Sequence, residues 1–407
     1  MLSMSKANIP WGTMNSTRSM GFNTRAVKMG EFRDTRYGNV TTPIFENSTF
    51  LGPNPDSNPF LDSTNGKPFL YTRWGNPTLQ SLEEKHAALE GAERSLSFSS
   101  GMSAISAAVL AVSRKGSRIL SISELYGQTY IFFKNTLERL GIRAEMIPLD
   151  SMNEIDSIPD GVSAVYTESV VNPTMGVSDL SRIAKACRES GVPLIVDATF
   201  CSPYNQRPLE FGASIVVHSA TKYISGHSDV IFGLAAASEK FYHGLVDMRK
   251  TFGFVPDPIQ AFIAARGMKT LGLRMKQHNQ NAMELARLLS EDRMVKTVHY
   301  PGLSQFRYHE IASRVLTGFG GMLAFELNGG EPAARKFMRS LKIPEVAPSL
   351  GGVESLITLP VDTTHASLSS EERKSIGISD GLVRFSAGIE DTQDLVEDFK
   401  EALSALR

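Results

Sequence analysis

Six short apolar segments alternate with longer helical stretches between residues 94 and 237, and this alternation constrains the fold more than any other feature. One connecting stretch, LSRIAKACRES at 180–190, is typical of a helix and is followed by Gly191, a common residue after a helix end. Strands that alternate with helices predict a mostly parallel sheet wrapped by helices, an α/β fold. The expected strands are RSLSF (94–98), RILSI (118–122), SAVYTE (163–168), PLIVD (193–197), SIVVHS (214–219) and VIFGLAAA (230–237).

The chain after residue 266 has a different pattern. A long helix is expected over residues 275–292, and apolar strands follow at 321–327 and 382–388 before a last helix at 395–406. This pattern predicts a smaller α+β domain at the C-terminus.

The first part of the chain is expected to hold little regular structure. Residues 51–78 are rich in Pro, Gly and Asn, which favour turns. The first thirty residues have no acid, but they lack both an apolar stretch and an amphipathic repeat, so we expect a mobile arm in preference to a transit peptide. The chain therefore divides into an N-terminal arm (1–73), a first domain (74–266) and a C-terminal domain (267–407).

The composition excludes several classes of function. With 42% apolar and 21% charged residues and a net charge of −1, nothing indicates a nucleic-acid or membrane partner. The longest apolar stretch, at 104–112, is too short to span a bilayer. Cys187 and Cys201 are the only cysteines, which favours a reducing, cytoplasmic setting.

Chemically suggestive residues follow four of the expected strands. Glu168 and Asp197 end two of them, SSGMSA follows the first, and Thr221 and Lys222 come after SIVVHS. Because ligands of an open α/β sheet bind outside the carboxyl ends of the strands, these residues should converge on one site.

Two of these segments predict an anion site. SSGMSA opens a helix at Gly101, where unpaired backbone N–H groups and the helix dipole favour an anion. The hydroxyls of Ser219 and Thr221 would complete a phosphate cup. Taken alone, each segment is equally consistent with an ordinary turn or surface loop.

A lysine and a carboxylate beside this cup extend the prediction. Lys222, if desolvated, would form a Schiff base readily. Asp197 could pair with a protonated pyridine nitrogen, and Tyr126 offers an aromatic face for ring stacking. Together they predict a site for pyridoxal 5′-phosphate (PLP).

Other interpretations of nearby residues are weaker. His218 and His227 with Asp229 could be metal ligands, but no third ligand has a suitable spacing, so we expect no metal. Cys201 is expected to pack in the core and not to act as a nucleophile.

With these motifs, the sequence resembles the PLP-dependent Cys/Met metabolism (trans-sulfuration) family: cystathionine γ-synthase, cystathionine γ-lyase, methionine γ-lyase and the O-acylhomoserine sulfhydrylases. The resemblance implies the fold type I of PLP-dependent transferases, with residues 74–266 as the PLP-binding domain. It also implies a homotetramer of two tight dimers, in which the N-terminal arm contacts the neighbouring subunit. The matching stretches, in family order, are YGNVTTPIFENSTF, YTRWGNPT, SSGMSAI, ELYGQTY, ESVVNPTMG, VDATFCSPYNQRPLEFGASIVVHSATKYISGHSDV, PSLGGVESLITLP, THASLS and LVRFSAGIED.

The resemblance also implies roles for individual residues. Lys222 is the implied Schiff-base lysine, and Tyr126 is implied to stack on the ring and to assist catalysis. Arg384 and Ser349 are implied to grip the substrate carboxylate, which an Arg fork binds in a bidentate manner. The implied cofactor-binding residues are Gly101, Met102, Tyr126, Asn172, Asp197, Ser219, Thr221 and Lys222, with Tyr71 and Arg73 reaching the phosphate of the neighbouring subunit.

Departures from the family pattern bear on the substrate. Methionine γ-lyases usually have Cys where this chain has Gln128, and a Lys-Asp pair where it has residues 249–250 (Arg-Lys). Members that use cystathionine place Glu and Arg at the positions of Pro348 and Ile131. A pocket that holds Pro348 and Ile131 should prefer a short or apolar γ-substituent, because an unpaired buried charge is costly.

We therefore expect γ-elimination from methionine or homocysteine, with O-acetylhomoserine sulfhydrylation or cystathionine synthesis or cleavage as alternatives. The substrate amine would displace Lys222, which then removes the α-proton. Loss of a β-proton would expel the γ-substituent, and water would give 2-oxobutanoate and ammonia. A PLP-binding regulatory homologue without activity is the alternative from another class. It is disfavoured because Lys222, Tyr126 and Arg384 are all present.

Overall fold

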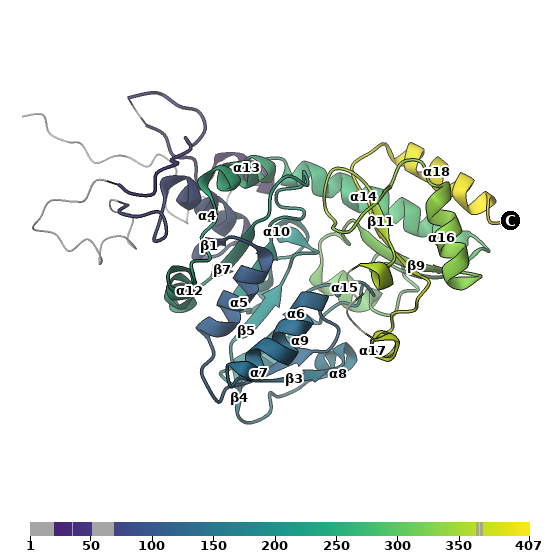
Figure 1. The fold of residues 1–407 in the computed structure, drawn as a ribbon, viewed down its shortest axis with the longest axis horizontal. Helices are drawn as coiled ribbons and strands as arrows, with labels where there is room; N and C mark the ends of the chain where they lie inside the picture. Colours follow the sequence, from purple (N-terminus) through teal and green to yellow (C-terminus); the bar gives the residue numbers. More distant parts are fainter. Residues whose placement is uncertain (1–19, 35, 51–68, 364–365, 367–368) are drawn as a thin grey trace, which may run out of the picture.

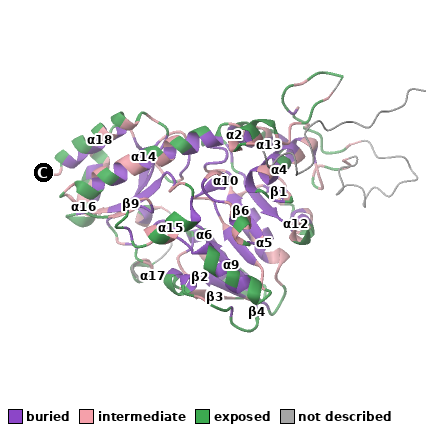
Figure 2. Cartoon of the chain, turned by 180° about the vertical axis from the view of Figure 1, so that it is seen from behind, coloured by how far each residue is buried: buried purple, intermediate pink, exposed green. Residues whose placement is uncertain are grey.

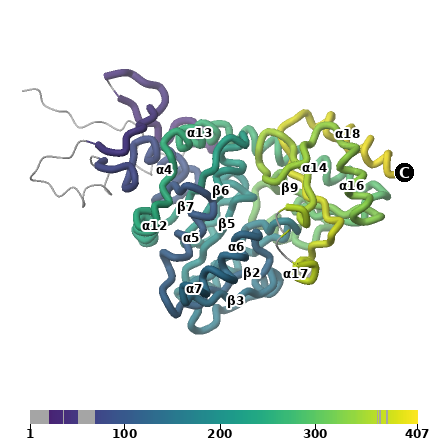
Figure 3. Tube along the Cα trace, viewed as in Figure 1, coloured from purple at the N-terminus to yellow at the C-terminus, as the bar shows by residue number. Residues whose placement is uncertain are grey.

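The computed structural model describes residues 20–34, 36–50, 69–363, 366 and 369–407 of the chain. The expected arm before residue 20, most of the turn-rich segment and part of THASLS lie outside these residues. The chain forms two sheets, and Figure 3 shows the C-terminal third gathered at one end of the molecule.

The first sheet has seven strands in the order β1-β7-β6-β5-β4-β2-β3. Only β7 runs antiparallel to its neighbours, so the predicted mostly parallel sheet is confirmed. The strands are β1 (Arg94–Phe98), β2 (Arg118–Ile122), β3 (Arg143–Ile147), β4 (Val162–Glu168), β5 (Leu194–Asp197), β6 (Ile215–Ser219) and β7 (Gly233–Ala237).

Two details of this sheet differ from the prediction. Strand β3 was not expected, because RAEMI alternates polar and apolar residues at an edge of the sheet and is only partly buried. The strand expected from residue 230 begins only at Gly233, after a turn that returns the chain antiparallel to β6.

Helices cover both faces of this sheet (Figure 1). Helix α5 (Gly101–Ala111) packs on β6 and β7 on one face, and α4 (Pro77–Glu90) packs on β1 and β7. Figure 2 shows the strands buried between exposed helix surfaces. The other helices of this part are α6 (Gly127–Ile131), η1 (Phe132–Thr136), α7 (Leu137–Arg139), α8 (Leu149–Asn153), α9 (Leu180–Glu189), α10 (Ser202–Asn205), α11 (Pro208–Phe211), α12 (Glu239–Phe252) and α13 (Pro258–Met268).

The second sheet has five strands in the order β10-β11-β12-β9-β8 and is antiparallel except for the β10/β11 pair. The long helix α14 (Leu271–Glu291) leads into it and begins four residues before the predicted start. The smaller α+β unit is thus confirmed. Its elements are β8 (Val295–His299), α15 (His309–Val315), β9 (Met322–Leu327), α16 (Gly330–Ser340), β10 (Glu345–Val346), β11 (Leu356–Thr358), η2 (Pro360–Asp362), α17 (Ser370–Ser375), β12 (Leu382–Ser386) and α18 (Thr392–Ser404).

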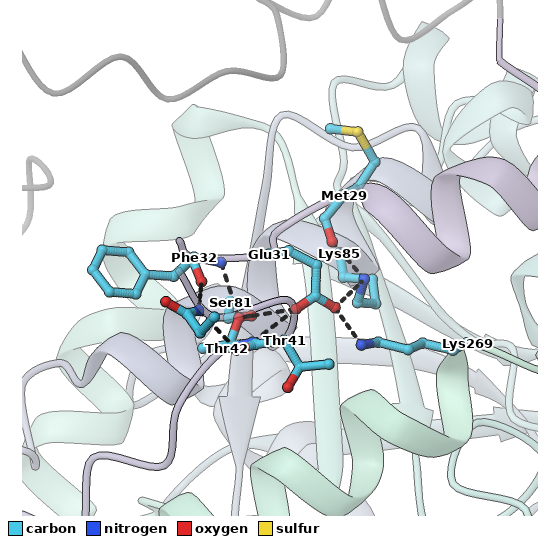
Figure 4. A network of polar contacts seen from close by, with 9 residues as sticks. Met29, Glu31, Phe32, Thr41, Thr42, Ser81, Lys85 and Lys269 are labelled. Carbon is cyan, nitrogen blue, oxygen red and sulfur yellow. Dashed lines mark hydrogen bonds and ion pairs between the residues drawn. The ribbon is translucent and has the colours of Figure 1, made fainter. Parts of the chain in front are cut away.

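The N-terminal segment after α2 (Phe22–Lys28) is held against α4 and the end of α13 by a partly buried ion-pair network (Figure 4). The Glu31 carboxylate lies 2.7 Å from Lys269 Nζ and 3.4 Å from Lys85 Nζ, and it accepts the Thr42 N–H. Lys85 is fully buried, so removing Glu31 would leave an unpaired charge in the core.

Candidate active site

The carboxyl ends of β4, β5 and β6 open into a cavity of about 440 Å³, within the usual size of a small-molecule site. Residues of the C-terminal sheet close its other side. Of the predicted site residues, those that line the cavity are Gly101, Met102, Tyr126, Asn172, Asp197, Ser219, Thr221, Lys222, Ser349 and Arg384. The predicted convergence of strand ends is therefore observed.

The residues of the expected phosphate cup lie together where α5 begins. Gly101 is the first residue of α5, and Ser100 caps the helix by accepting the Ser103 N–H at 3.1 Å. A Cβ added at Gly101 would lie 2.6 Å from Ser219 Cβ, so only glycine allows the helix start to approach the end of β6 this closely. The Ser219 and Thr221 side chains join the free N–H groups of this helix end in one concave wall.

Lys222 lies directly after β6, and its Nζ lies 2.7 Å from Ser349 Oγ. Burial, and secondarily the charge of Arg384, lower the pKa of Lys222 to about 8. A lysine of this kind holds a substantial neutral fraction near neutral pH, which both Schiff-base formation and proton abstraction require.

Asp197 ends β5, and its carboxylate accepts the Thr199 N–H at 2.9 Å. Glu168 ends β4 directly opposite Asp197 in the strand register, and both residues line the cavity. Burial raises the pKa of each carboxyl, and the Asp197 charge raises that of Glu168 further, to about 8. A cationic ring nitrogen beside Asp197 would offset this burial cost.

Arg384 lies in the middle of β12 and is buried. Its Nη1 donates to Asn172 Oδ1 at 3.2 Å and its Nη2 to the Ser349 carbonyl at 2.9 Å. The guanidinium thus joins the two walls of the cavity, and no carboxylate among the described residues is hydrogen-bonded to it, which suits it to a substrate carboxylate.

Tyr71 and Arg73 are the predicted site residues that the fold does not bring to this cavity. Both are exposed, the Arg73 guanidinium lies over the Tyr71 ring, and Arg73 Nη1 donates to the Lys250 carbonyl at 3.0 Å. Both side chains face outward, which is what we expect of residues that contribute to the site of another subunit.

His218 does not lie beside His227. It alternates with Ser219 on β6, so it points to the opposite face of the sheet from the cavity. There its Nε2 contacts Glu90 Oε1 at 2.5 Å, next to His86, and these three are the described residues placed closely enough to share an ion. His227 instead contacts the Ser225 carbonyl.

Several lining residues were not assigned from the sequence. Pro348 lies at the exposed rim, as expected, whereas Ile131 ends α6 and does not line the cavity. Glu168 was expected only to converge with the other strand ends. Further lining residues to which the sequence analysis gave no role are Ser100, Ile105, Val170, Thr199, Phe200, Ile231 and Leu350. All but Ile231 lie within the stretches that carry the family resemblance, and proximity to Asp197 could have indicated Thr199.

The residues present fit PLP: a glycine-walled anion seat, a desolvated lysine and a carboxylate at neighbouring strand ends meet in one cavity. Residues 23–404 match the family described as Cys/Met metabolism PLP-dependent enzyme. The chain belongs to this family. It is thus a PLP-dependent enzyme of the carbon–sulfur lyase and γ-replacement class, and the non-catalytic alternative is not supported.

Relatives of this family member carry different activities. It is 39% identical to the L-methionine gamma-lyase of Pseudomonas putida over 396 residues, covering 96% of this chain and 99% of that protein. It is 38% identical to the cystathionine gamma-lyase of Dictyostelium discoideum, covering 96% and 99%. A cystathionine gamma synthase structure from Xanthomonas oryzae pv. oryzae, in complex with aminoacrylate and cysteine, is 37% identical with a TM-score of 0.87, covering 95% and 98%.

Proposed function

We propose that the enzyme catalyses γ-elimination from methionine or homocysteine, releasing 2-oxobutanoate, ammonia and a thiol. One observation supports this choice of substrate. Among the described residues, the charged side chains that line the cavity are Glu168, Asp197, Lys222 and Arg384. The two cations are needed for the reaction and the α-carboxylate, so neither remains for a charged tail.

The other lining residues of the cavity strengthen this argument. Many of them are apolar, among them Val170, Phe200, Ile231 and Leu350. A γ-substituent that carries a second carboxylate or a phosphate would lose its hydration among these side chains without a cationic partner, which is costly. A methylthio, thiol or acetyl group is uncharged, so its transfer from water to this cavity would cost little free energy.

The neighbouring hollow also disfavours an anionic tail. It has a volume of about 540 Å³ and shares Thr221, Ile231, Pro348 and Ser349 with the cavity. Its charged lining residues are Asp229 and Glu354, both acidic. O-Succinyl and O-phospho substrates would place like charges beside these carboxylates.

PLP, when bound, supplies an electron sink that stabilises negative charge on the substrate carbons. The chain's residues bind and move protons around it. Arg384 binds the α-carboxylate, Lys222 Nζ takes the proton from Cα, and Ser349 Oγ holds Nζ in place through the 2.7 Å contact. Tyr126, which lines the cavity, donates a proton to the departing sulfur.

O-Acetylhomoserine sulfhydrylation is the second candidate. Its acetyl group is short and uncharged, so the same lining residues accept it. The two activities differ in whether water or a thiol reaches the substrate after the γ-substituent leaves.

We further propose that the active unit is a dimer within a homotetramer in which Tyr71 and Arg73 of each copy serve the other. Their exposure and their distance from the cavity of their own chain support this. Both cysteines are free and buried, which fits a reducing, cytoplasmic setting. Among the described helices, none has the length and hydropathy needed to cross a bilayer.

The test is a substrate panel with the PLP-loaded enzyme: methionine, homocysteine, cystathionine, O-succinylhomoserine, and O-acetylhomoserine with and without sulfide. We expect 2-oxobutanoate from methionine or homocysteine with the highest kcat/KM. If the main product is homocysteine made from O-acetylhomoserine and sulfide, the second candidate function is correct and γ-elimination is not. If cystathionine or O-succinylhomoserine gives the highest kcat/KM, both candidate functions are refuted.

A further inference from the structure

Glu168 is a cavity residue to which the proposed reaction gives no role. It ends β4, is 4% exposed, and faces Asp197 across the strand register. Two carboxyls buried side by side are costly, so a compensating interaction is needed. The compensation comes from the backbone of two other site residues.

Glu168 Oε1 accepts the Tyr126 N–H at 2.6 Å, and Oε2 accepts the Asn172 N–H at 3.5 Å. Tyr126 is the N-cap of α6 and has no side-chain cap of its own, so Glu168 fixes the point at which this helix begins. Asn172 in turn accepts from Arg384 Nη1 at 3.2 Å. One carboxyl therefore connects β4 to three side chains that line the cavity.

We infer that Glu168 is a positioning residue: by accepting these backbone N–H groups it holds the Tyr126 ring and the Asn172 amide against the cofactor. The inference rests on the roles proposed for Tyr126 and Asn172, but not on which substrate the enzyme takes. No catalytic proton passes through Glu168.

The charges around Glu168 decide whether its carboxyl accepts these N–H groups in the protonated or the ionised form. Asp197 on β5, Glu124 after β2, and the hydroxyls of Tyr126 and Tyr166 are the titratable groups facing Glu168. Burial and the Asp197 charge raise the pKa of Glu168 to about 8, which favours the protonated carboxyl. A protonated carboxyl still accepts the Tyr126 N–H through its carbonyl oxygen. An acceptor is therefore required at this position, and a negative charge is not.

This separates two substitutions of nearly equal size. Glu168→Gln keeps one acceptor oxygen, enough for the short bond from the Tyr126 N–H, and gives up the charge and the 3.5 Å contact with the Asn172 N–H. Glu168→Met keeps the length of the side chain and removes both acceptors. The matched control is Glu124→Met. Glu124 also accepts a backbone N–H, from Leu149 at 3.0 Å, but does not line the cavity.

The experiment titrates each apoprotein with PLP by visible absorbance and measures the unfolding temperature in parallel. We expect the Kd for PLP to stay within about threefold of wild type for Glu168→Gln and Glu124→Met. It should rise at least about tenfold for Glu168→Met, because the Tyr126 ring and the Asn172 amide are then no longer held in place for the cofactor. Glu168→Met and Glu124→Met should lower the unfolding temperature by similar amounts, because each leaves a backbone N–H without its acceptor. The inference is overturned if Glu168→Met binds PLP with a Kd as low as that of Glu124→Met. It is also overturned if Glu168→Gln binds PLP as weakly as Glu168→Met. Because PLP binding is measured without an amino acid, these outcomes do not depend on the substrate proposal.

Discussion

The two walls of the cavity are built in different ways. The cofactor wall comes from consecutive parallel strands and the start of α5, with Asp197, Ser219 and Lys222 at or just beyond strand ends. The substrate wall comes from the C-terminal sheet, where Arg384 lies in the middle of β12 and Ser349 on the loop before β11.

The backbone of the two walls also differs. Each cofactor residue follows a buried strand in ordinary geometry, whereas Ser349 has φ +92°, a conformation that costs a non-glycine residue about 1–3 kcal/mol. In this conformation Ser349 Oγ accepts from Lys222 Nζ at 2.7 Å. The comparison teaches that cofactor binding and substrate choice rest on different sheets and should respond separately to substitution.

Substitution of Lys222 should have the largest effect, because this residue is proposed both to hold the cofactor and to take the proton from the substrate. We expect Lys222→Ala to lose the yellow colour of the bound cofactor and nearly all turnover, since acid–base assistance alone is worth about a hundred- to ten-thousand-fold. Borohydride reduction of the wild type, followed by peptide mapping, should place the cofactor on Lys222. A reduced adduct on another lysine would contradict the assignment.

Arg384→Lys should break the substrate wall alone. Lysine cannot reproduce the fork, so we expect kcat/KM to fall about tenfold to a hundredfold, from a charged hydrogen bond worth roughly 1.5–3 kcal/mol. The Kd for PLP should stay within about threefold, as should both quantities in Arg335→Lys, an exposed control arginine paired with Asp362. Equal losses of PLP affinity and kcat/KM in Arg384→Lys would show that the walls are not separable.

Complementation would extend the comparison to a second subunit. If Arg73 completes the cofactor wall of a neighbour, Arg73→Ala and Lys222→Ala are each nearly inactive, and mixed dimers regain activity because one site receives both wild-type residues. The measurement is turnover after refolding the two variants together, with subunit exchange verified by mass spectrometry. Verified hybrids without any recovery, or a fully active monomer, would exclude shared sites.

Pro348 tests how the substrate wall selects between substrates. It lies at the exposed rim of the cavity, and the family resemblance implies a glutamate at this position in members that use cystathionine. The wild type should therefore prefer methionine, homocysteine or O-acetylhomoserine over cystathionine by at least about tenfold in kcat/KM. Pro348→Glu should narrow this ratio, and Pro348→Ala, which changes the loop in the same way without adding charge, should not. The expectation fails if the wild type prefers cystathionine.

The smallest effect is a pH dependence that couples the two walls. Burial and the Arg384 charge lower the pKa of Lys222 from 10.5 to about 8. Between these values the unfolded chain binds more protons than the folded one, so the free energy of unfolding of the apoprotein should rise with pH, on the order of 1 kcal/mol from this group. Urea unfolding should be measured between pH 8 and 10.5, and the free energy of unfolding should rise less with pH in Lys222→Met than in the wild type. A curve parallel to wild type would mean that Lys222 titrates normally.

The sequence by itself determined the alternation of strands and helices, the parallel sheet and most of the cofactor wall. Residues at strand ends are placed by local periodicity, since a buried strand of known direction delivers its last residue to a known edge. Asp197, Thr221 and Lys222 could therefore be assigned, and the motifs added Arg384 and Ser349.

Only the tertiary structure decided which side chains meet across the two sheets. The contact of Lys222 with Ser349 joins residues far apart in the chain, as does that of Arg384 with Asn172, and no periodicity encodes either. It also placed Ile131 outside the cavity and Glu168 within bonding distance of the Tyr126 backbone. The physical reason is that a strand's period fixes which face a residue occupies, whereas its partner on another element depends on how the two elements pack.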